Sequence, residues 1–454
     1  MPSSIETNAA LPIAIIGAGP VGLAAAAQLT ARGLRPLVIE AGAGPGAAVR
    51  QWGHVRMFSP WRFNVDAAAR ALLEGQGWKA PPPASFPTGN ELVADYVEPL
   101  ARALSQAGVD LHYGARVTGI SRRHHDRLHD GAPGRGRAEA PFVLQVEGAD
   151  GHTDTIEARA VIDATGTWSS PNPASAHGLP APGETPASAH IRYGIPDVLG
   201  ADRATYAEAT TLVLGGGHSA MNTVLDLVKL GDGARILWAF RRPLGAVNFG
   251  GGAADGLAAR GALGARAQSL VEAGRIEALA PFLVHRIEQK GGRLEVQGER
   301  EGQAASVTVD RLIVATGFRP DLSMLGELRL DLDRAVQATP ALAPLIDPNL
   351  HSCGTVRPHG EAELRHPGEP GFYMAGMKSY GRAPTFLLAT GHEQVRSIAA
   401  YLAGDLEAAR RVELELPETG VCSASRPVIE IKAPAAAGSC CAASPAPAAK
   451  ECCG

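Results

Sequence analysis

The sequence predicts an α/β fold made of two three-layer domains, the second inserted in the first. Two glycine-rich turns, at residues 17–22 and 215–220, each follow a short apolar strand and open a helix. Two further apolar strands end in Ala-Thr-Gly, at residues 164–166 and 315–317. Strand–turn–helix units of this kind build Rossmann-like dinucleotide-binding domains.

The order of these motifs predicts the domain boundaries. We expect residues 1–200 and 321–412 to form the first domain and residues 201–320 the inserted one. Residues 413–454 are rich in alanine, proline and serine and contain few large apolar side chains, so we expect a disordered, cysteine-rich tail. A chain of 454 residues is long enough for two or three domains.

The first turn, GAGPVG, lies between a predicted strand at residues 13–16 and a predicted helix at residues 21–32. Its first glycine permits the tight turn, its second lets a pyrophosphate approach the backbone, and its third lets the helix pack on the strand. An acid at the end of the next strand, residues 36–40, can accept hydrogen bonds from a ribose. The candidate cofactor-binding residues here are Gly17, Gly19, Pro20, Gly22 and Glu40.

The second turn, GGGHSA, repeats the pattern between a strand at residues 212–214 and a helix. The strand that comes next, residues 235–240, ends in two arginines and not in an acid. Arginines at this position suit the 2′-phosphate of NADPH; the alternative is two solvated arginines on a loop. The candidate residues are Gly215, Gly217, His218, Ser219, Ala220, Arg241 and Arg242.

Small residues at several other strand ends would let the backbone pass close to a dinucleotide. They are Thr165 and Gly166, Thr316 and Gly317, and Gly376 after a predicted strand at residues 372–375. A long helix is predicted to begin near Pro384 or Thr385. The segment HVRMFSPW would supply donors and stacking surface to a cofactor ring through Arg56 and Trp61, or would be an ordinary packed loop.

Between the motifs, the sequence predicts a helix led by a capping box at Thr88 and Glu91, and a strand at residues 111–117. Residues 142–146 and 153–158 alternate as an antiparallel pair. The polar segment 121–141 holds three histidines, which favour a solvated hairpin tip over a metal site.

Composition excludes several classes of protein. The net charge of −4 provides no basic surface for nucleic acid or anionic membranes. Residues 11–29 carry no charge, but their glycines and proline fit a turn better than a membrane helix, and no basic segment of a signal peptide precedes them. Five of the six cysteines lie in the last 33 residues, which is not a disulfide framework, so we expect a cytoplasmic protein.

Together these motifs resemble two-dinucleotide-binding flavoproteins, most specifically the class B flavin-dependent monooxygenases, over residues 11–405. The resemblance implies FAD on the first turn and NADPH on the second. The family signature between the two turns has its best match in ASAHIRYGIP, which contains His190, although the expected Phe and closely spaced Gly are missing. In the C-terminal flavin motif, AGD is altered to AGMK, and Lys378 is expected where an Asp often faces the flavin. The motifs are GAGPVG with Glu40, DATGTWSSPNP (163–173), GGGHSA and ATGFRPD (315–321).

A narrower resemblance joins HVRMFSPW, KSYGRAPTFLLATGHEQVRS and the cysteine tail to flavoprotein monooxygenases encoded with arsenic-resistance genes. Two adjacent cysteine pairs in the tail suit As(III) or another thiophilic metal such as Hg(II). Zinc is a third option, and an incidental thiol-rich end is the remaining one. The candidate ligands are Cys440, Cys441, Cys452 and Cys453.

The leading hypothesis is therefore an NADPH- and FAD-dependent monooxygenase that oxidises a small soft nucleophile such as a trivalent arsenical. His190, Arg56 and Lys378 are candidates for orienting roles in catalysis. One alternative is a flavin-dependent NADPH reductase linked to metalloid handling, and another is a metalloid-binding chaperone or sensor on a flavoprotein scaffold. Mercuric-reductase and thioredoxin-reductase chemistry needs a dithiol near the flavin, and no cysteine precedes residue 353. The sequence indicates no oligomeric state.

Overall fold

The structure of the protein is a computed structural model that describes residues 10–132, 135–245, 258–351, 359–383 and 386–414, together with Asn8 and Phe249. All elements below belong to the compact unit Met1–Ser423. None of the six cysteines lies among the described residues.

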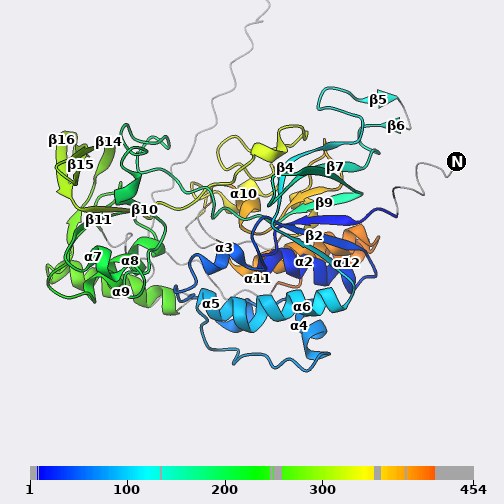
Figure 1. The fold of residues 1–454 in the computed structure, drawn as a ribbon, viewed down its shortest axis with the longest axis horizontal. Helices are drawn as coiled ribbons and strands as arrows, with labels where there is room; N and C mark the ends of the chain where they lie inside the picture. The colour runs from blue at the N-terminus through cyan, green and yellow to red at the C-terminus, as the bar shows by residue number, and fades with distance from the viewer. Residues whose placement is uncertain are drawn as a thin grey trace, which may run out of the picture. The chain divides into compact units, whose positions relative to one another are not determined.

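The first domain is built on a five-stranded parallel sheet in the order β18-β9-β1-β2-β3 (Figure 1). Four helices cover one face of this sheet, and the alanine-rich α2 lies in the middle of them. These strands are β1 (Ile13–Ile16), β2 (Pro36–Glu40), β3 (Asp110–Tyr113), β9 (Ala160–Asp163) and β18 (Phe372–Met374). The helices are α2 (Pro20–Thr30), α4 (Ala67–Glu74), α6 (Glu98–Gln106) and α11 (Leu388–Leu402).

An antiparallel sheet covers the other face of the first parallel sheet, which completes three layers. It contains β4 (Ala115–Arg122), β7 (Phe142–Gly148) and β8 (Thr153–Ala158). Alternate residues of the buried strands face the two sides, so Ile13 and Ile15 join the helical core while Ala14 and Ile16 pack toward β4 and β7.

The second domain repeats this plan around a parallel sheet in the order β10-β17-β11-β12-β13. Helices pack on one face, and the antiparallel sheet β14-β15-β16 packs on the other (Figure 1). The parallel strands are β10 (Ile191–Tyr193), β11 (Thr210–Leu214), β12 (Arg235–Ala239), β13 (Glu277–Leu279) and β17 (Arg311–Val314). The remaining elements are α7 (Arg203–Tyr206), α8 (His218–Val228), α9 (Ala258–Glu272), β14 (Leu283–Lys290), β15 (Arg293–Arg300) and β16 (Gln303–Val309).

Shorter elements connect these layers. They are α3 (Ala47–Arg50), η1 (Trp61–Phe63), α5 (Gly89–Leu92), the π-helical turn η2 (Val93–Val97), β5 (Gly131–Ala132), β6 (Arg135–Gly136), η3 (Ser188–His190), η6 (Ser323–Leu325), α10 (Ala343–Ile346), η7 (Glu361–Leu364), η8 (Gly376–Tyr380) and α12 (Leu406–Arg410).

The predicted fold class is confirmed, and the differences from prediction are local. The strand predicted at residues 111–117 is split at Gly114, whose φ of 64° turns the chain out of the parallel sheet into the antiparallel one. Strand β10 lies in the second sheet, so that sheet begins before the boundary expected at residue 200. The helix predicted near Pro384 or Thr385 is α11, which begins at Leu388; those two residues lie outside the described part. No helix in the described ranges is long and apolar enough to cross a membrane.

A buried ionic cluster ties the antiparallel sheet to the segment before β18. The carboxylate of Glu369 lies 2.6 Å from both Arg122 Nε and Arg137 Nη1, and all three side chains are almost completely buried. The backbone N–H of Arg329 also donates to Glu369. The guanidinium of Arg122 in addition stacks over the Phe142 ring at 3.6 Å. The cluster satisfies charges that would otherwise be costly to bury.

Candidate functional site

The first glycine turn has the geometry that close approach of a dinucleotide requires. Gly17 has a φ of 102°, and a Cβ on it would lie 2.8 Å from the Ala164 carbonyl oxygen. A Cβ on Gly22 would lie 2.0 Å from the Gly17 carbonyl oxygen. Around Gly19, in contrast, a Cβ would meet no protein atom within 4 Å. The outer two glycines are therefore needed by the fold, and the middle one leaves a space beside the backbone.

Helix α2 begins in this turn and presents its N-terminus at the carboxyl edge of the first sheet. Gly19 is the N-cap, Pro20 is the first helical residue, and neither a side-chain cap nor an acidic residue is present in the first turn. Helix geometry leaves the first-turn N–H groups without intrahelical acceptors. Free N–H groups and the positive end of a helix dipole are the features that favour phosphate at helix N-termini.

Glu40 closes β2 beside the turn. Its Oε2 accepts a 2.7 Å hydrogen bond from the Ala18 N–H, and its Oε1 accepts a 2.6 Å bond from the Gly42 N–H. These bonds fix the carboxylate between two loops while each oxygen keeps a second lone pair. Glu40 therefore lies at the end of β2, as predicted, and its role as a ribose acceptor stays a prediction.

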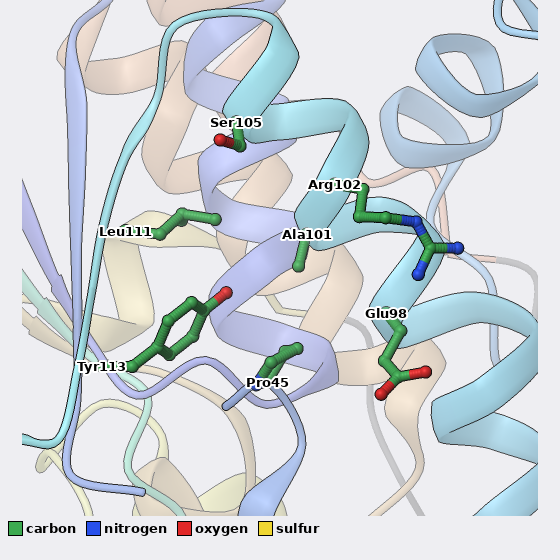
Figure 2. A pocket seen from close by; sticks show the side chains of 7 residues that line it. All are labelled: Pro45, Glu98, Ala101, Arg102, Ser105, Leu111 and Tyr113. Carbon is green, nitrogen blue, oxygen red and sulfur yellow. The ribbon is translucent and has the colours of Figure 1, made fainter. Parts of the chain in front are cut away.

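A pocket adjoins this position at the end of β3 (Figure 2). Tyr113 is the β-register partner of Glu40, and the pocket lies between β3, the loop at Pro45 and helix α6. Burial, together with the nearby charge of Glu40, raises the pKa of Tyr113 above its usual value, so the phenol stays neutral. The residues that line the pocket are Pro45, Glu98, Ala101, Arg102, Ser105, Leu111 and Tyr113.

The second glycine turn reproduces the first. Gly215 has a φ of 136°, and a Cβ on it would lie 2.3 Å from the Ala315 carbonyl oxygen. Gly217 again has open space at its Cβ position and is the N-cap of α8, whose first residue is His218. No side-chain cap or first-turn acid is present here either. Both turns therefore offer an uncapped helix N-terminus at the carboxyl edge of a parallel sheet.

The two arginines predicted to select the nucleotide come after the end of β12. Arg241 and Arg242 are both exposed, and the buried Phe240 separates them from the strand. They lie beyond the carboxyl end of the strand that pairs with β11, as an adenosine 2′-phosphate site requires.

The two Ala-Thr-Gly strands run beside the two turns. In the first sheet Asp163 is the register partner of Ile16, and in the second Val314 is the partner of Leu214. The Thr and Gly of each motif follow the carboxyl ends of β9 and β17, and all four residues are partly or fully exposed. They are Thr165, Gly166, Thr316 and Gly317.

The segments that leave these motifs join each other, a feature that the sequence did not predict. Asn172 N–H donates to the Gly317 carbonyl at 2.9 Å, and its Nδ2 donates to the Thr316 carbonyl at 3.1 Å. Pro171 and Phe318 form an antiparallel bridge. The signal in the sequence was that both segments come after the same Ala-Thr-Gly motif.

Aromatic side chains fill the space near these turns. Phe58, from the HVRMFSPW segment, has its ring centroid 5.7 Å from that of His218 at the start of α8. The Trp168 ring packs against Phe318 in a tilted arrangement with 4.8 Å between centroids, and its Nε1 donates to Gln51 Oε1 at 2.8 Å. The segment after the first domain's Glu40 thus reaches the second glycine turn.

Trp61, predicted to stack on a cofactor, packs elsewhere. It is 5% exposed and belongs to the core between the first sheet and its helices, so little ring surface is free for stacking. Arg56 is bridged to Thr88, donates to the Phe86 carbonyl and lies 3.6 Å from Glu91, which holds it on the surface of its own domain.

His190 is not brought to the glycine turns. It precedes β10, at the amino end of a parallel strand, whereas the turns lie at carboxyl ends. Its Nδ1 lies 2.8 Å from Arg311 Nη1, and its Nε2 lies 3.2 Å from Gln289 Nε2. These contacts hold His190 at the amino end of β10, on the side of the second sheet opposite the glycine turn.

Lys378 does lie at the first site. Its Nζ is 2.6 Å from Asp163 Oδ2 and 3.1 Å from Thr165 Oγ1, and both charged side chains are at most 1% exposed. Gly376, two residues earlier, has a φ of 70° and would contact Val21 of α2 through an added Cβ. The turn that carries Lys378 therefore lies against the first turn of α2.

The predicted metalloid ligands Cys440, Cys441, Cys452 and Cys453 lie outside the described residues. Within the described ranges, no group of three or more potential metal-binding side chains is present. The histidine-rich segment 121–141 includes the short β5–β6 hairpin.

This arrangement defines a class of protein: a two-domain Rossmann-like α/β fold in which each domain has a glycine turn, a helix N-terminus and an Ala-Thr-Gly strand. Residues 11–367 match the family described as pyridine nucleotide-disulphide oxidoreductase. The chain belongs to this family and is a flavin-dependent pyridine nucleotide oxidoreductase. Family members bind FAD and NAD(P)H.

Several solved structures share the fold. A bacillithiol disulfide reductase from Bacillus cereus is 20% identical, with a TM-score of 0.62 over 87% of this chain and 99% of that chain. A thioredoxin reductase from Lactococcus lactis is 18% identical, with a TM-score of 0.55 over 87% and 98%. A mutant flavin monooxygenase from Stenotrophomonas maltophilia is 21% identical, with a TM-score of 0.53 over 87% and 98%. No curated protein matched the sequence.

Proposed function

We propose that the protein is an NADPH- and FAD-dependent monooxygenase that oxidises a soft nucleophile. The observation that carries the proposal is the set of side chains around the first glycine turn. The residues around its glycine turn include Val21, Ala164 and Thr165, and none of the described residues there is a cysteine. The first cysteine of the chain is residue 353. A flavin held here would have no dithiol among the described residues to accept its electrons, which favours dioxygen as the acceptor.

The residues fit FAD at the first turn. Open space at Gly19 and the uncapped N-terminus of α2 would hold the pyrophosphate, and Glu40 would accept hydrogen bonds from the adenosine ribose. Bound FAD would supply the transfer of electrons from NADPH to dioxygen. The contributions of the chain are to bind and orient the two dinucleotides and to exclude water with Phe58 and Trp168.

NADPH would occupy the second turn, with its pyrophosphate at Gly217 and its 2′-phosphate at Arg241 and Arg242. Arginine offers a planar set of donors that matches a phosphate, whereas NADH carries an uncharged 2′-hydroxyl at this position.

A trivalent arsenical is the substrate that we propose to test first. The support is the resemblance of the sequence motifs to arsenic-associated monooxygenases, together with the paired cysteines of the tail. Adjacent thiolates suit As(III), so the tail would bind the metalloid before its oxidation. Truncation after Leu414 should abolish As(III) binding by the isolated protein and leave NADPH oxidation unchanged; retained As(III) binding would contradict a role for the tail. No side-chain base is assigned to the reaction.

The experiment that tests the monooxygenase proposal tracks the oxygen atom. The enzyme is incubated with NADPH, ¹⁸O₂ and, in separate reactions, methylarsenite, arsenite, an organic sulfide or an amine. One ¹⁸O atom in the product for each NADPH consumed is the expected result. NADPH oxidation that yields only hydrogen peroxide or unlabelled product with every substrate would contradict oxygen insertion.

A reductase is the second candidate. Two observations favour it: the similar structures include disulfide reductases, and the tail contains two vicinal cysteine pairs that could act as a dithiol. Under anaerobic conditions such an enzyme would couple NADPH oxidation to reduction of a disulfide or a metalloid. Loss of this coupling in the truncated chain, with full coupling in the complete chain, would establish it in place of the monooxygenase.

A further inference from the structure

The buried pair formed by Lys378 and Asp163 lies directly beside the first glycine turn. Asp163 is the last residue of β9 and the register partner of Ile16, the residue before Gly17. Its Oδ2 faces the Lys378 ammonium at 2.6 Å, while its Oδ1 accepts bonds from the N–H and Oγ1 of Thr165 at 3.1 and 2.7 Å. The Asp163 carboxylate thus contacts both Lys378 and Thr165 of the Ala-Thr-Gly turn.

The position of Lys378 is fixed by a second set of hydrogen bonds. Gln394 of α11 accepts a 2.8 Å bond from the Gly376 N–H and donates a 2.9 Å bond to Ser379 Oγ. Ser379 in turn donates to the Gly376 carbonyl at 2.7 Å. This clamp holds both ends of the short turn that carries the lysine, so its ammonium has little freedom to move away from Asp163.

The charges of this pair act at short range on any ligand that binds at the turn. A buried charge whose partner is removed is costly and creates a strong local field, because little water is present to screen it. The same ammonium helps to hold the pKa of Asp321 below its usual value, after the hydrogen bonds from Ser323, so its charge reaches beyond Asp163. The Lys378 ammonium thus forms an ion pair with Asp163 and donates one hydrogen bond to Thr165 Oγ1.

We propose that Lys378 and Asp163 form a charge-balancing pair that sets both the affinity of the first site for FAD and the electron affinity of the bound flavin. Lys378 neutralises a carboxylate that would otherwise repel the phosphates and any negative charge on the flavin. It is a positioning residue that acts through Asp163 and Thr165. This inference rests on the proposed assignment of FAD to the first site.

The test is a double-mutant cycle of Lys378→Met and Asp163→Asn with two binding measurements. FAD is titrated into apoprotein, and sulfite is titrated into the FAD-loaded protein, since sulfite addition places negative charge on the flavin ring. Lys378→Met leaves the carboxylate unpaired and should weaken both FAD and sulfite binding about tenfold. Asp163→Asn leaves the ammonium unpaired and should tighten sulfite binding about tenfold. The double variant should return sulfite affinity to within about threefold of wild type.

A matched control is the pair of the exposed Lys229 and the partly exposed Asp226, joined at 2.6 Å at the C-terminal end of helix α8. Lys229→Met and Asp226→Asn should leave both affinities within about twofold of wild type, because solvent screens surface pairs. If Lys378→Met does not fold, Lys378→Arg replaces it: the retained charge should keep sulfite affinity within about threefold of wild type.

Sulfite affinities that change in the same direction in both single variants, or that do not change, would overturn the proposal. Failure of wild-type apoprotein to bind FAD would instead contradict the proposed cofactor site. The two failures are therefore distinguishable.

Discussion

Gly19 and Gly22 lie in the same turn but meet opposite requirements. A Cβ at Gly22 would collide with the Gly17 carbonyl oxygen at 2.0 Å, whereas a Cβ at Gly19 would enter open space. The sequence predicted the close packing at Gly22, because the spacing of a glycine turn between a strand and a helix reflects local backbone geometry, while the pyrophosphate expected at Gly19 stays a prediction. The positions of individual side chains were less predictable: Trp61 lies in the core, and His190 lies at the amino end of β10.

We expect Gly22→Ala to destabilise the apoprotein by about 2 kcal/mol, because the backbone of the turn must move. Gly19→Ala should leave apoprotein stability within about 0.5 kcal/mol of wild type but weaken FAD binding about tenfold or more, because its methyl group occupies the space for the pyrophosphate. Urea unfolding of the apoprotein and FAD titration measure the two effects. Gly44→Ala, at another open position, is the control and should change neither. Equal behaviour of the Gly19 and Gly22 variants would contradict this distinction.

His366 predicts a pH dependence of stability. Burial is the main cause that lowers its pKa from 6.5 to about 4, and the backbone of Asp331 opposes this only in part. The unfolded chain therefore binds a proton more readily than the folded one between these values, so stability is complete above the unfolded pKa and falls as pH decreases toward 4. The loss from this residue should be about 2 kcal/mol at pH 5 relative to pH 7. Denaturant unfolding across this range should show a smaller slope for His366→Leu; an unchanged slope would contradict the assignment.

Among secondary-structure features, those set by neighbouring residues could be predicted from the sequence, whereas those set by contacts between distant segments could not. The capping box of Thr88 and Glu91 is present at the start of α5, because its residues interact within one turn. The split of the strand at Gly114 depends instead on which sheet each half joins. The Glu369 cluster could not be predicted from the sequence either, because Arg122 and Arg137 are far from Glu369 along the chain.

We expect Glu369→Gln to destabilise the protein by about 3 kcal/mol, because two buried guanidinium groups lose their counter-charge. Burial alone would raise the pKa of Glu369, but the Arg329 N–H and the two arginines outweigh it and lower the pKa. This stabilisation is therefore present above the unfolded pKa and is lost as pH falls through the folded pKa. Urea unfolding at neutral pH measures the effect. Glu157→Gln removes a partly exposed pair with Arg123 and should cost less than about 1 kcal/mol, and an equal cost for both variants would be contrary to expectation.

Across the whole molecule, one layered plan is used twice. Each parallel sheet places a glycine turn, a helix N-terminus and an Ala-Thr-Gly strand at its carboxyl edge, and the two sheets differ mainly in the residues at the end of the second strand. Glu40 ends that strand in the first sheet, and Arg241 and Arg242 lie just beyond it in the second. This difference was visible in the sequence because it depends on residue type at a fixed distance from a motif.

Replacing Arg241 and Arg242 together by alanine should raise the KM for NADPH by about 10- to 100-fold, since each arginine would contribute a charge-assisted hydrogen bond to the phosphate in the proposed site. The KM for NADH should change less than about threefold, because NADH has no 2′-phosphate. Steady-state kinetics with both nucleotides measure the effect. Replacement of the surface residue Arg235, paired with Glu277, is the control. An equal rise in KM for NADPH and NADH would show that the arginines do not recognise the 2′-phosphate.

The hydrogen bonds of Asn172 to Thr316 and Gly317 bring the two connecting segments together at one point. The chain thus enters and leaves the inserted domain through adjacent strands, and a short loop could close the gap if that domain were excised. In evolutionary terms, such a junction makes the nucleotide-binding half an exchangeable module. Its specificity could be replaced by transplantation of one continuous stretch of sequence without rebuilding the sheet that holds the other cofactor.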